Sequence, residues 1–258
     1  MRNTANQGGH MSEYIEIPRM PNPSCNLPED LDTPVWRYMD MDKFQSLLNE
    51  KALYLCRADR LEDRFEGSYS RQQILDSEDW LTKTGNSQVI ETEREHRIKD
   101  RLTTYINCWC ISDCDLDLMW KAYVRNPPGV AIKSSLRRLI NICDKAIGHW
   151  LLDISTVTYF NHAEGEYIDY FGTPTTFLYK DIHFKLDNEL RIIHSPNCSD
   201  PTFTHVFLPI DLKDLIEIVV LQPKVKENSL KSVREALSRV GLDKIPVLTS
   251  RDDRELIE

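Results

Sequence analysis

Apolar residues recur along the chain in two kinds of block, which are short runs and longer stretches with helical spacing. The short runs predict strands at residues 34–38, 53–56, 104–111, 130–132, 154–160, 203–209, 215–221 and 246–248. The longer stretches predict helices at residues 41–51, 72–83, 88–103, 115–124, 134–146 and 225–240, with one or two helical turns at 177–185. Strands and helices follow no regular βαβ order and the sequence has no glycine-rich phosphate loop, so the pattern predicts the α+β class.

The predicted helices differ in how much apolar surface they carry. The first places Phe44, Leu47 and Leu48 on one face and should pack on the core, with Asp40 or Asp42 as its N-cap. The second and third helices are dense in charge and have few apolar positions. We therefore expect these two helices to be solvated.

The apolar pattern also indicates how the chain is divided. Residues 1–32 have no hydrophobic period and predict a flexible N-terminal tail, and residues 251–258 predict a short C-terminal tail. Residues 33–250 predict a single mixed α+β domain, in which the run LIEIVVL at 215–221 should be a fully buried strand.

Charge and cysteine content narrow the class of protein. The chain has 258 residues, a net charge of −9 and no basic block, so a nucleic-acid groove is not expected. It has no long apolar run and no signal-peptide pattern, so we expect neither membrane insertion nor secretion. Seven dispersed Cys fit reduced thiols. These properties together predict a cytoplasmic protein.

The segment KDIHFKLDNELRII, residues 180–193, gathers a Lys, two acids and an Arg. If a strand begins at Asp187, then Asp187, Glu189 and Arg191 share one face while Leu190 and Ile192 point to the other. Carboxylates two residues apart on a strand are separated by roughly 7 Å, so each can act on a different part of one ligand. The segment is thus either an active-site strand or an edge strand whose solvent face carries a salt bridge.

Two kinds of metal site are conceivable from the sequence. The spacing of Cys108, Cys110 and Cys114 differs from the paired Cys-x-x-Cys knuckles of structural zinc, so these residues are better interpreted as core thiols. Acids at positions 59, 62, 63 and 66, together with Asp187 and Glu189, could bind a hard cation in a metal-dependent nuclease. The lack of a basic groove argues against that interpretation, and we expect no metal.

A further set of residues lies at or near the ends of predicted strands, namely Arg37, Tyr38, Tyr54, Ser112 and Glu189. Cleavage of the bond between nicotinamide and ribose needs a donor for the pyrophosphate, an aromatic ring against the nicotinamide and a carboxylate near the ribose. This set supplies all three. The alternative is that Tyr38 is a core aromatic, Arg37 a surface charge and Ser112 a helix cap.

Several segments, including WRYMDMDKFQSLLNEKALYL, RLEDRFEG, CWCISDCDLDLMWKAYVRNPPGVAI and KDIHFKLDNELRI, resemble the bacterial domain-of-unknown-function family 2971. The residues that carry the resemblance are Tyr38, Phe65, Glu66, Ser112, Leu118, Met119, Trp120, Tyr123, Gly129, Lys180, Phe184, Asp187, Glu189 and Arg191. This chain departs from the family where Glu62-Asp63-Arg64 replaces most of an Asn-Asp-Pro sequence and where Asp187 replaces a Glu. The family's name states no activity.

The order of the elements is also similar to ADP-ribosyltransferases, which have an Arg or His strand, a helix, an aromatic strand and a late Glu strand. This similarity is an analogy of layout. It implies a split sheet with surrounding helices and an enzyme acting on NAD or another nucleotide, as a toxin or phage-defence effector. The alternatives are a noncatalytic module that binds a protein partner and the metal-dependent nuclease.

The layout also implies roles for the candidate residues. Glu189, Asp187 and Arg191 would form the catalytic set, with Glu189 as the catalytic carboxylate. Arg37 would bind phosphate, Tyr38 and Tyr54 would stack on a ring, and Ser112 and Lys180 would complete the nucleotide site. Arg191 and Lys180 would also keep the carboxylates ionised.

Overall fold

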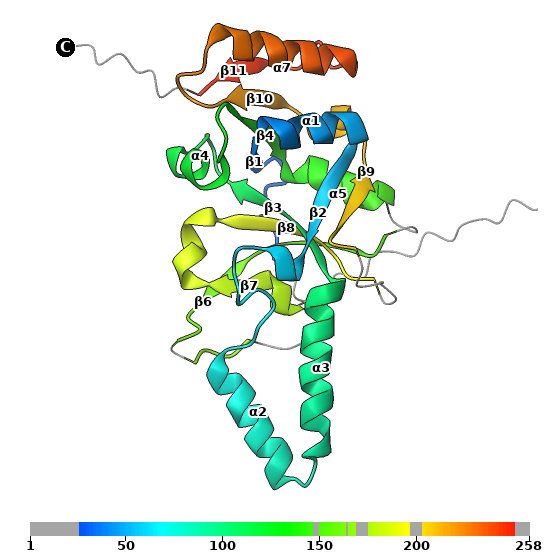
Figure 1. The fold of residues 1–258 in the computed structure, drawn as a ribbon, viewed down its shortest axis with the longest axis vertical. Helices are drawn as coiled ribbons and strands as arrows, with labels where there is room; N and C mark the ends of the chain where they lie inside the picture. Colours follow the sequence, from blue (N-terminus) through cyan, green and yellow to red (C-terminus); the bar gives the residue numbers. More distant parts are fainter. Residues whose placement is uncertain (1–25, 147–149, 164, 169–174, 197–202, 251–258) are drawn as a thin grey trace, which may run out of the picture.

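The computed structural model describes residues 26–146, 150–163, 165–168, 175–196 and 203–250. In this part of the chain, helices and a large mixed sheet form an α+β fold, as the sequence predicts (Figure 1). The strands of the large sheet are β1 (Pro34–Asp40), β2 (Ala52–Arg57), β3 (Tyr105–Ile111), β4 (Gly129–Ser135), β5 (Leu152–Thr156), β8 (Glu189–His194), β9 (His205–Pro209), β10 (Ile218–Leu221) and β11 (Val247–Thr249). A second, small sheet pairs β6 (Thr158–Phe160) with β7 (Tyr179–Asp181).

The large sheet forks at β3. One end of β3 pairs with β1 through Trp36 and Cys110, and its other end pairs with β2 through Cys56 and Ile106. Both partners use the same edge of β3, because its opposite edge is paired with β8 along the whole strand. Hence β1 and β2 diverge, and the middle of β3, Asn107–Trp109, pairs with neither of them.

Helices cover the apolar face of this sheet. They are α1 (Met41–Glu50), α5 (Leu136–Ala146), α6 (Leu212–Leu215) and α7 (Glu227–Arg239). As the sequence predicts, Phe44, Leu47 and Leu48 of α1 are buried in the main core. The strands contribute alternate residues to the same core, such as Leu190 and Ile192 of β8. The opposite face of the sheet is therefore the one available for polar side chains.

The opposite face is only partly covered. Helix α4 (Asp117–Tyr123) packs there through Met119 and Trp120 against Trp36 and Tyr38 of β1. The short 3₁₀ helices η2 (Thr175–Leu178) and η3 (Ile182–Asp187) flank β7, and η1 (Ala58–Arg60) follows β2. The space at the fork lies between these pieces and α1 of the helix-covered face, since residues of both faces line it.

The remaining helices, α2 (Arg71–Lys83) and α3 (Gln88–Thr103), form a hairpin that projects from the body at the end opposite α7 (Figure 1). Neither helix contains a buried residue, so the prediction that both are solvated is confirmed. The two helices are joined by a bidentate ion pair between Arg94 and Glu78, with both N–O distances 3.0 Å. Ser70 caps α2 by accepting a hydrogen bond from the backbone N–H of Gln73.

Several sequence-based boundaries are wrong in detail. The strand expected at 154–160 is divided between β5 and β6, and the run at 215–221 begins with the end of α6, so only Ile218–Leu221 is a strand. Asp40 occupies the N-cap position of α1 but does not cap it, because its carboxylate accepts the backbone N–H groups of Arg125 and Asn126.

The predicted tails fall mainly on residues 1–25 and 251–258, which lie outside the described residues. The end of the first tail, residues 26–32, packs on the body. Asn26 accepts a hydrogen bond from the backbone N–H of Thr156 at 2.8 Å, and Asp32 forms an ion pair with Arg137. The N-terminal boundary of the folded body therefore lies before residue 33.

The predicted strand from Asp187 also needs correction. Asp187 ends η3, and β8 begins only at Glu189. Asn188, between them, adopts a left-handed conformation with φ 41°, which Asn tolerates better than most residues. Its side-chain amide donates to the carbonyl of Ile111 at 2.8 Å. The chain thus turns sharply at Asn188, and Asp187 reaches the charged face from a turn.

Candidate active site

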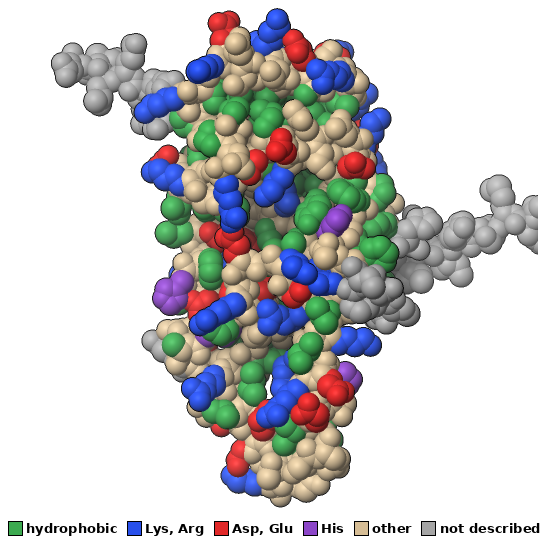
Figure 2. Space-filling model, viewed as in Figure 1, with side chains coloured by type: hydrophobic (Ala, Val, Ile, Leu, Met, Phe, Trp, Pro, Cys, Tyr) green, Lys and Arg blue, Asp and Glu red, His purple; other side chains and the backbone are tan. Residues whose placement is uncertain are grey.

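A cavity of about 710 Å³ opens above the fork in the sheet. Its walls come from β1, α1, β2, the loop after β2, β3, α4 and the segment from Lys180 to Arg191. The face of the molecule shown in Figure 2 is hollowed near its middle, with Lys and Arg side chains beside the hollow. The predicted site residues that line the cavity are Arg37, Tyr38, Tyr54, Lys180, Asp187, Glu189 and Arg191.

Ser112 is the predicted site residue that does not line this cavity. Its hydroxyl donates to the carbonyl of Cys114 at 2.6 Å, and its carbonyl accepts the indole N–H of Trp36 at 2.8 Å. The alternative role as the cap of α4 is not observed either, because the N-cap position belongs to Leu116. Ser112 therefore organises the turn after β3.

A cluster of alternating charges forms one wall of the cavity. The guanidinium of Arg191 donates to both oxygens of Glu66 at 2.6 and 2.9 Å and, through Nε, to Glu189 at 2.7 Å. Lys180 donates to the other oxygen of Glu189 at 2.5 Å and to Asp187 at 2.9 Å. We call these five residues the charged cluster; with three acids and two bases, it carries one net negative charge.

The charged cluster is buried, so its internal pairing matters. Glu66 and Arg191 are each 1% exposed and Glu189 is 4% exposed. The strand β8 pairs with both β3 and β5, so the interpretation as an edge strand with a solvated salt bridge is wrong. A buried carboxylate or guanidinium without a partner would be very costly, and the cluster avoids this by pairing each charge.

The pKa directions follow from this pairing. Desolvation alone would raise the pKa of Glu189, but the positive charges of Arg191 and Lys180 outweigh it and hold the pKa well below the ordinary value. Desolvation would likewise lower the pKa of Lys180, and the charge of Glu189 raises it instead. Burial raises the pKa of Glu66, while the bidentate contact with Arg191 opposes that rise. The geometry thus keeps Glu189 ionised through Arg191 and Lys180, which is the role that the similarity of layout implied for these two residues.

Asp187 is the most accessible carboxylate of the charged cluster. Its side chain is 16% exposed. One oxygen, Oδ2, accepts both from Lys180 at 2.9 Å and from the hydroxyl of Tyr123 at 3.2 Å. The other oxygen, Oδ1, receives no hydrogen bond from the described residues. In Glu189, by contrast, both oxygens are occupied, so Asp187 is the carboxylate that has an oxygen left for a ligand.

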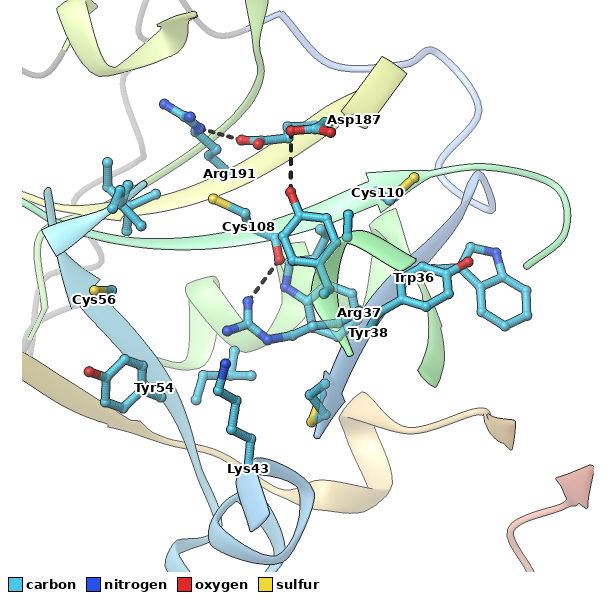
Figure 3. A pocket seen from close by; sticks show the side chains of 18 of the residues that line it. Trp36, Arg37, Tyr38, Lys43, Tyr54, Cys56, Cys108, Cys110, Asp187 and Arg191 are labelled. Atoms are coloured by element: carbon cyan, nitrogen blue, oxygen red, sulfur yellow. Dashed lines mark hydrogen bonds and ion pairs between the residues drawn. The ribbon is translucent and has the colours of Figure 1, made fainter. Parts of the chain in front are cut away.

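Arg37 lies on the other side of the cavity, at the divergence of β1 from β3. Its guanidinium donates to the free carbonyl of Cys108 in the middle of β3 at 2.7 Å, and among the described residues it forms no ion pair. Desolvation lowers the pKa of Arg37. Figure 3 shows Lys43 projecting from α1 toward the same space. Two cations that face a cavity, neither of them in an ion pair within the described part of the chain, form a site suited to an anion.

The two predicted stacking residues differ in accessibility. Tyr38 is 7% exposed, packs edge-on against Trp120 with ring centroids 4.9 Å apart, and accepts the N–H of Leu116 through its hydroxyl. Its ring is therefore mainly a core aromatic, which is the alternative that the sequence left open. Tyr54 is 41% exposed and lines the cavity on β2, so it retains surface for a ligand.

Three residues that belong to the charged cluster or contact it were given no role in the nucleotide site by the sequence. Tyr123 appeared in the family pattern without a role, and its hydrogen bond to Asp187 depends on tertiary packing. Phe177 contributes a carbonyl that accepts from Arg191 at 2.6 Å. Glu66 appeared in the family pattern, but its bidentate contact joins residues 125 positions apart. The family pattern thus held a sequence signal for Glu66 and Tyr123, and none for Phe177.

The three thiols expected in the interior are not equivalent. Cys108 and Cys110 line the cavity, and burial raises the pKa of Cys108 to about 12 and that of Cys110 to about 11. Cys114 is exposed on the turn after β3, so its placement in the core is wrong. Within the described ranges, no three His, Cys, Asp or Glu side chains are grouped so as to hold a metal ion.

Each helix in the described part of the chain is too short or too polar to cross a membrane. The chain matches no family model, no curated protein and no solved structure. The resemblance to family 2971 and the similarity of layout to ADP-ribosyltransferases accordingly stay predictions, and the function proposed below rests on the cavity.

Proposed function

We propose that the protein cleaves the N-glycosidic bond of NAD or a closely related nucleotide in the cavity above the fork. One observation carries the proposal: the guanidinium of Arg37 faces the same cavity as the charged cluster. It forms no ion pair among the described residues. A nucleotide matches both features, because its phosphates are anionic and its ribose develops positive charge when the N-glycosidic bond breaks. The cavity has the size of a typical small-molecule site, about 300–1,000 Å³.

The anionic half of the ligand is assigned to Arg37 and Lys43. A planar guanidinium can donate two parallel hydrogen bonds to phosphate oxygens, and the ammonium group adds a second positive charge. Because Arg37 is held at one nitrogen by the carbonyl of Cys108, its remaining N–H groups keep a fixed direction. Binding of pyrophosphate would offset the cost of desolvating this guanidinium.

The sugar half is assigned to Asp187. As the bond between C1′ of the ribose and the nicotinamide nitrogen breaks, its electron pair moves to the nitrogen, so that nicotinamide leaves as a neutral molecule. Positive charge develops on C1′ and the ring oxygen, where a carboxylate lowers the barrier. Water then forms the new bond to C1′ and loses one proton to Asp187 or solvent. The products are nicotinamide, ADP-ribose and one proton.

In this proposal Glu189 is a positioning residue. Both of its oxygens are occupied by Lys180 and Arg191 and it is 4% exposed, so its role is to hold Lys180 in place. Lys180 in turn orients Asp187, together with the hydroxyl of Tyr123. This differs from the sequence-based expectation, which gave the direct role to Glu189.

The experiment is nicotinamide release from NAD by the purified protein and its variants. Asp187→Asn should lower kcat by at least about 100-fold, which is the typical effect of removing one group that stabilises transition-state charge. Arg37→Met should mainly raise KM, because it removes binding that is common to substrate and transition state. Asp117→Asn is a matched control, since that exposed carboxylate also pairs with a Lys but lies outside the cavity lining.

Circular dichroism and thermal melting would establish that each variant is folded. The proposal would be overturned if the wild-type protein neither bound nor turned over NAD and related nucleotides. Full activity in folded Asp187→Asn would overturn the role of that carboxylate. If a protein partner binds instead, the noncatalytic module is the better interpretation, and magnesium-dependent cleavage of DNA or RNA would favour the nuclease.

A further inference from the structure

An aromatic patch lies beside the anion site, on the two outermost strands at that side of the fork. Tyr54 of β2 is paired directly with Phe207 of β9, and Cys56 with His205. Because paired residues point to the same face of a sheet, the three rings stand together. Tyr54 and Phe207 also line the cavity. We call Tyr54, His205 and Phe207 the aromatic platform.

The rings of the aromatic platform are arranged in a regular way. Tyr54 stacks on His205 with ring centroids 4.8 Å apart and an interplanar angle of 20°. Phe207 packs edge-on against both rings, at 5.8 Å from Tyr54 and 5.1 Å from His205. Since Tyr54 is still 41% exposed although His205 covers one of its faces, part of the ring remains open for another planar group.

The exposed part of the Tyr54 ring does not contribute to the stability of the fold, because only apolar surface removed from water does so. The opposite face of the same two strands carries Leu53, Leu55 and Leu208, which are all fully buried. The sheet is therefore already stabilised from its other side. The aromatic platform is not needed for the core, which makes a ligand the simplest occupant for it.

The position of Arg37 indicates which ligand. Arg37, Tyr54 and Tyr123 line the same cavity, and the hydroxyl of Tyr123 donates to Asp187. Figure 3 shows the guanidinium of Arg37 between Tyr54 on one side and Asp187 on the other. The cavity thus presents an aromatic surface, a cation and a carboxylate in that order.

We propose that the aromatic platform is a base subsite, which stacks the adenine of a dinucleotide whose pyrophosphate lies on Arg37 and whose far ribose reaches Asp187. A planar base linked through phosphate to a second ribose is the ligand chemistry that matches this order. Stacking on aromatic side chains is favourable for any base because each has a π-face. This inference rests on the proposed function and adds the adenine half of the substrate to it.

The test compares the binding of NAD with that of nicotinamide mononucleotide, which lacks the adenylate half, by isothermal titration calorimetry. Tyr54→Ala should weaken NAD binding by about 10-fold to 100-fold, the range expected for loss of one stacked base. Binding of nicotinamide mononucleotide should change by less than about twofold. Tyr54→Trp should restore NAD binding, since it keeps an aromatic surface.

Two further variants complete the experiment: Phe207→Leu is a second test of the aromatic platform, and Trp80→Ala is a control for the loss of an exposed ring. Phe207→Leu removes an aromatic ring from the aromatic platform while keeping an apolar side chain, and should weaken NAD binding in the same selective way. Trp80→Ala removes another exposed aromatic ring, 62% exposed on the projecting hairpin, and should leave both affinities unchanged.

The two proposals fail in different ways. If Tyr54→Ala and Phe207→Leu bind NAD as tightly as wild type, or lose both ligands equally, the base subsite is wrong while the reaction at Asp187 stands. If the wild-type protein binds neither ligand, the proposed function fails, and the base subsite with it.

Discussion

At the scale of single residues, Gly67 determines how closely the loop after β2 approaches the charged cluster. It has φ +69°, a conformation that other residues adopt only with strain. A Cβ atom at this position would lie within van der Waals overlap of the ring of Phe177. Its neighbour Glu66 and the carbonyl of Phe177 both bind Arg191. The absence of a side chain at Gly67 therefore permits the contact that closes the charged cluster.

We predict that Gly67→Ala lowers the free energy of unfolding by about 3 kcal/mol, of which about 1–2 kcal/mol comes from the backbone and the rest from the clash. Urea denaturation followed by fluorescence would measure it. Gly241→Ala is the matched control, because Gly241 has φ +73° and a Cβ atom there would meet nothing within 4 Å. That variant should lose only the backbone part, about 1–2 kcal/mol. Equal losses in the two variants would contradict the role of Phe177.

His194, the last residue of β8, is a second position where burial has a measurable consequence. Its ring packs against Trp150 at 4.7 Å and Tyr105 at 6.2 Å, and Nδ1 lies 2.9 Å from the carbonyl of Leu151. Desolvation by this packing lowers the pKa of His194, and the contact with Leu151 opposes it only partly.

Because the pKa of His194 is lower in the folded than in the unfolded state, its neutral form stabilises the protein fully above the unfolded pKa of about 6.5. This contribution is lost as the pH falls through that value toward the folded pKa. We predict that His194→Gln reduces the drop in melting temperature between pH 7.5 and pH 5.5, measured by thermal melting at the two pH values. An unchanged drop in His194→Gln would contradict the prediction.

At the scale of elements, the strand β8 has an apolar face and a charged face, and both are buried. One face contributes Leu190 and Ile192 to the core, and the other carries Glu189 and Arg191 in an equally buried position. The polar face is tolerated because Glu66, Lys180 and the carbonyl of Phe177 supply partners from three other segments. The stability of this strand therefore depends on contacts that are distant in sequence.

We predict that Arg191→Met destabilises the protein by about 3–5 kcal/mol, because it leaves the carboxylates of Glu66 and Glu189 buried without their guanidinium partner. Arg137→Met is the matched control, since the pair of Arg137 with Asp32 has similar geometry but is exposed. An exposed pair contributes about 0–1 kcal/mol. Urea unfolding of both variants would test this, and a loss in Arg191→Met no larger than in the control would contradict it.

At the scale of the whole molecule, the fork in the sheet links stability and function. The strand β3 is hydrogen-bonded along one edge by β8 and at both ends of its other edge by β1 and β2. The divergence of those two strands leaves the carbonyl of Cys108 free for Arg37. The same topology that makes β3 central thus creates the cavity and orients its cation.

We predict that amide hydrogen exchange is slowest in β3 and β8 and fastest in α2 and α3. The strands are paired within the sheet and buried, whereas the hairpin helices contain no buried residue. Exchange measured by mass spectrometry on peptides from each element would check this order. Protection of the hairpin comparable to that of β3 would contradict it.

Local chemistry determined much of the fold. The helical spacing of Phe44, Leu47 and Leu48 is enough to predict an amphipathic helix, and the charge density of α2 and α3 is enough to predict their solvation. The α+β class follows from the order of such elements. Boundaries failed where tertiary contacts override local pattern, as at Asn188, whose turn depends on its hydrogen bond to Ile111.

The candidate site divides in the same way. Residue type and position alone made Arg37, Lys180, Asp187, Glu189 and Arg191 candidates, because one charged segment and an Arg near the end of a predicted strand could supply groups that a ligand needs. Only the tertiary structure decided which of the acids keeps an oxygen for a ligand, that Tyr54 and not Tyr38 presents its ring, and that Ser112 lies outside the cavity. Exposure and pairing depend on segments far apart in sequence, and a local pattern contains no information about where those segments meet.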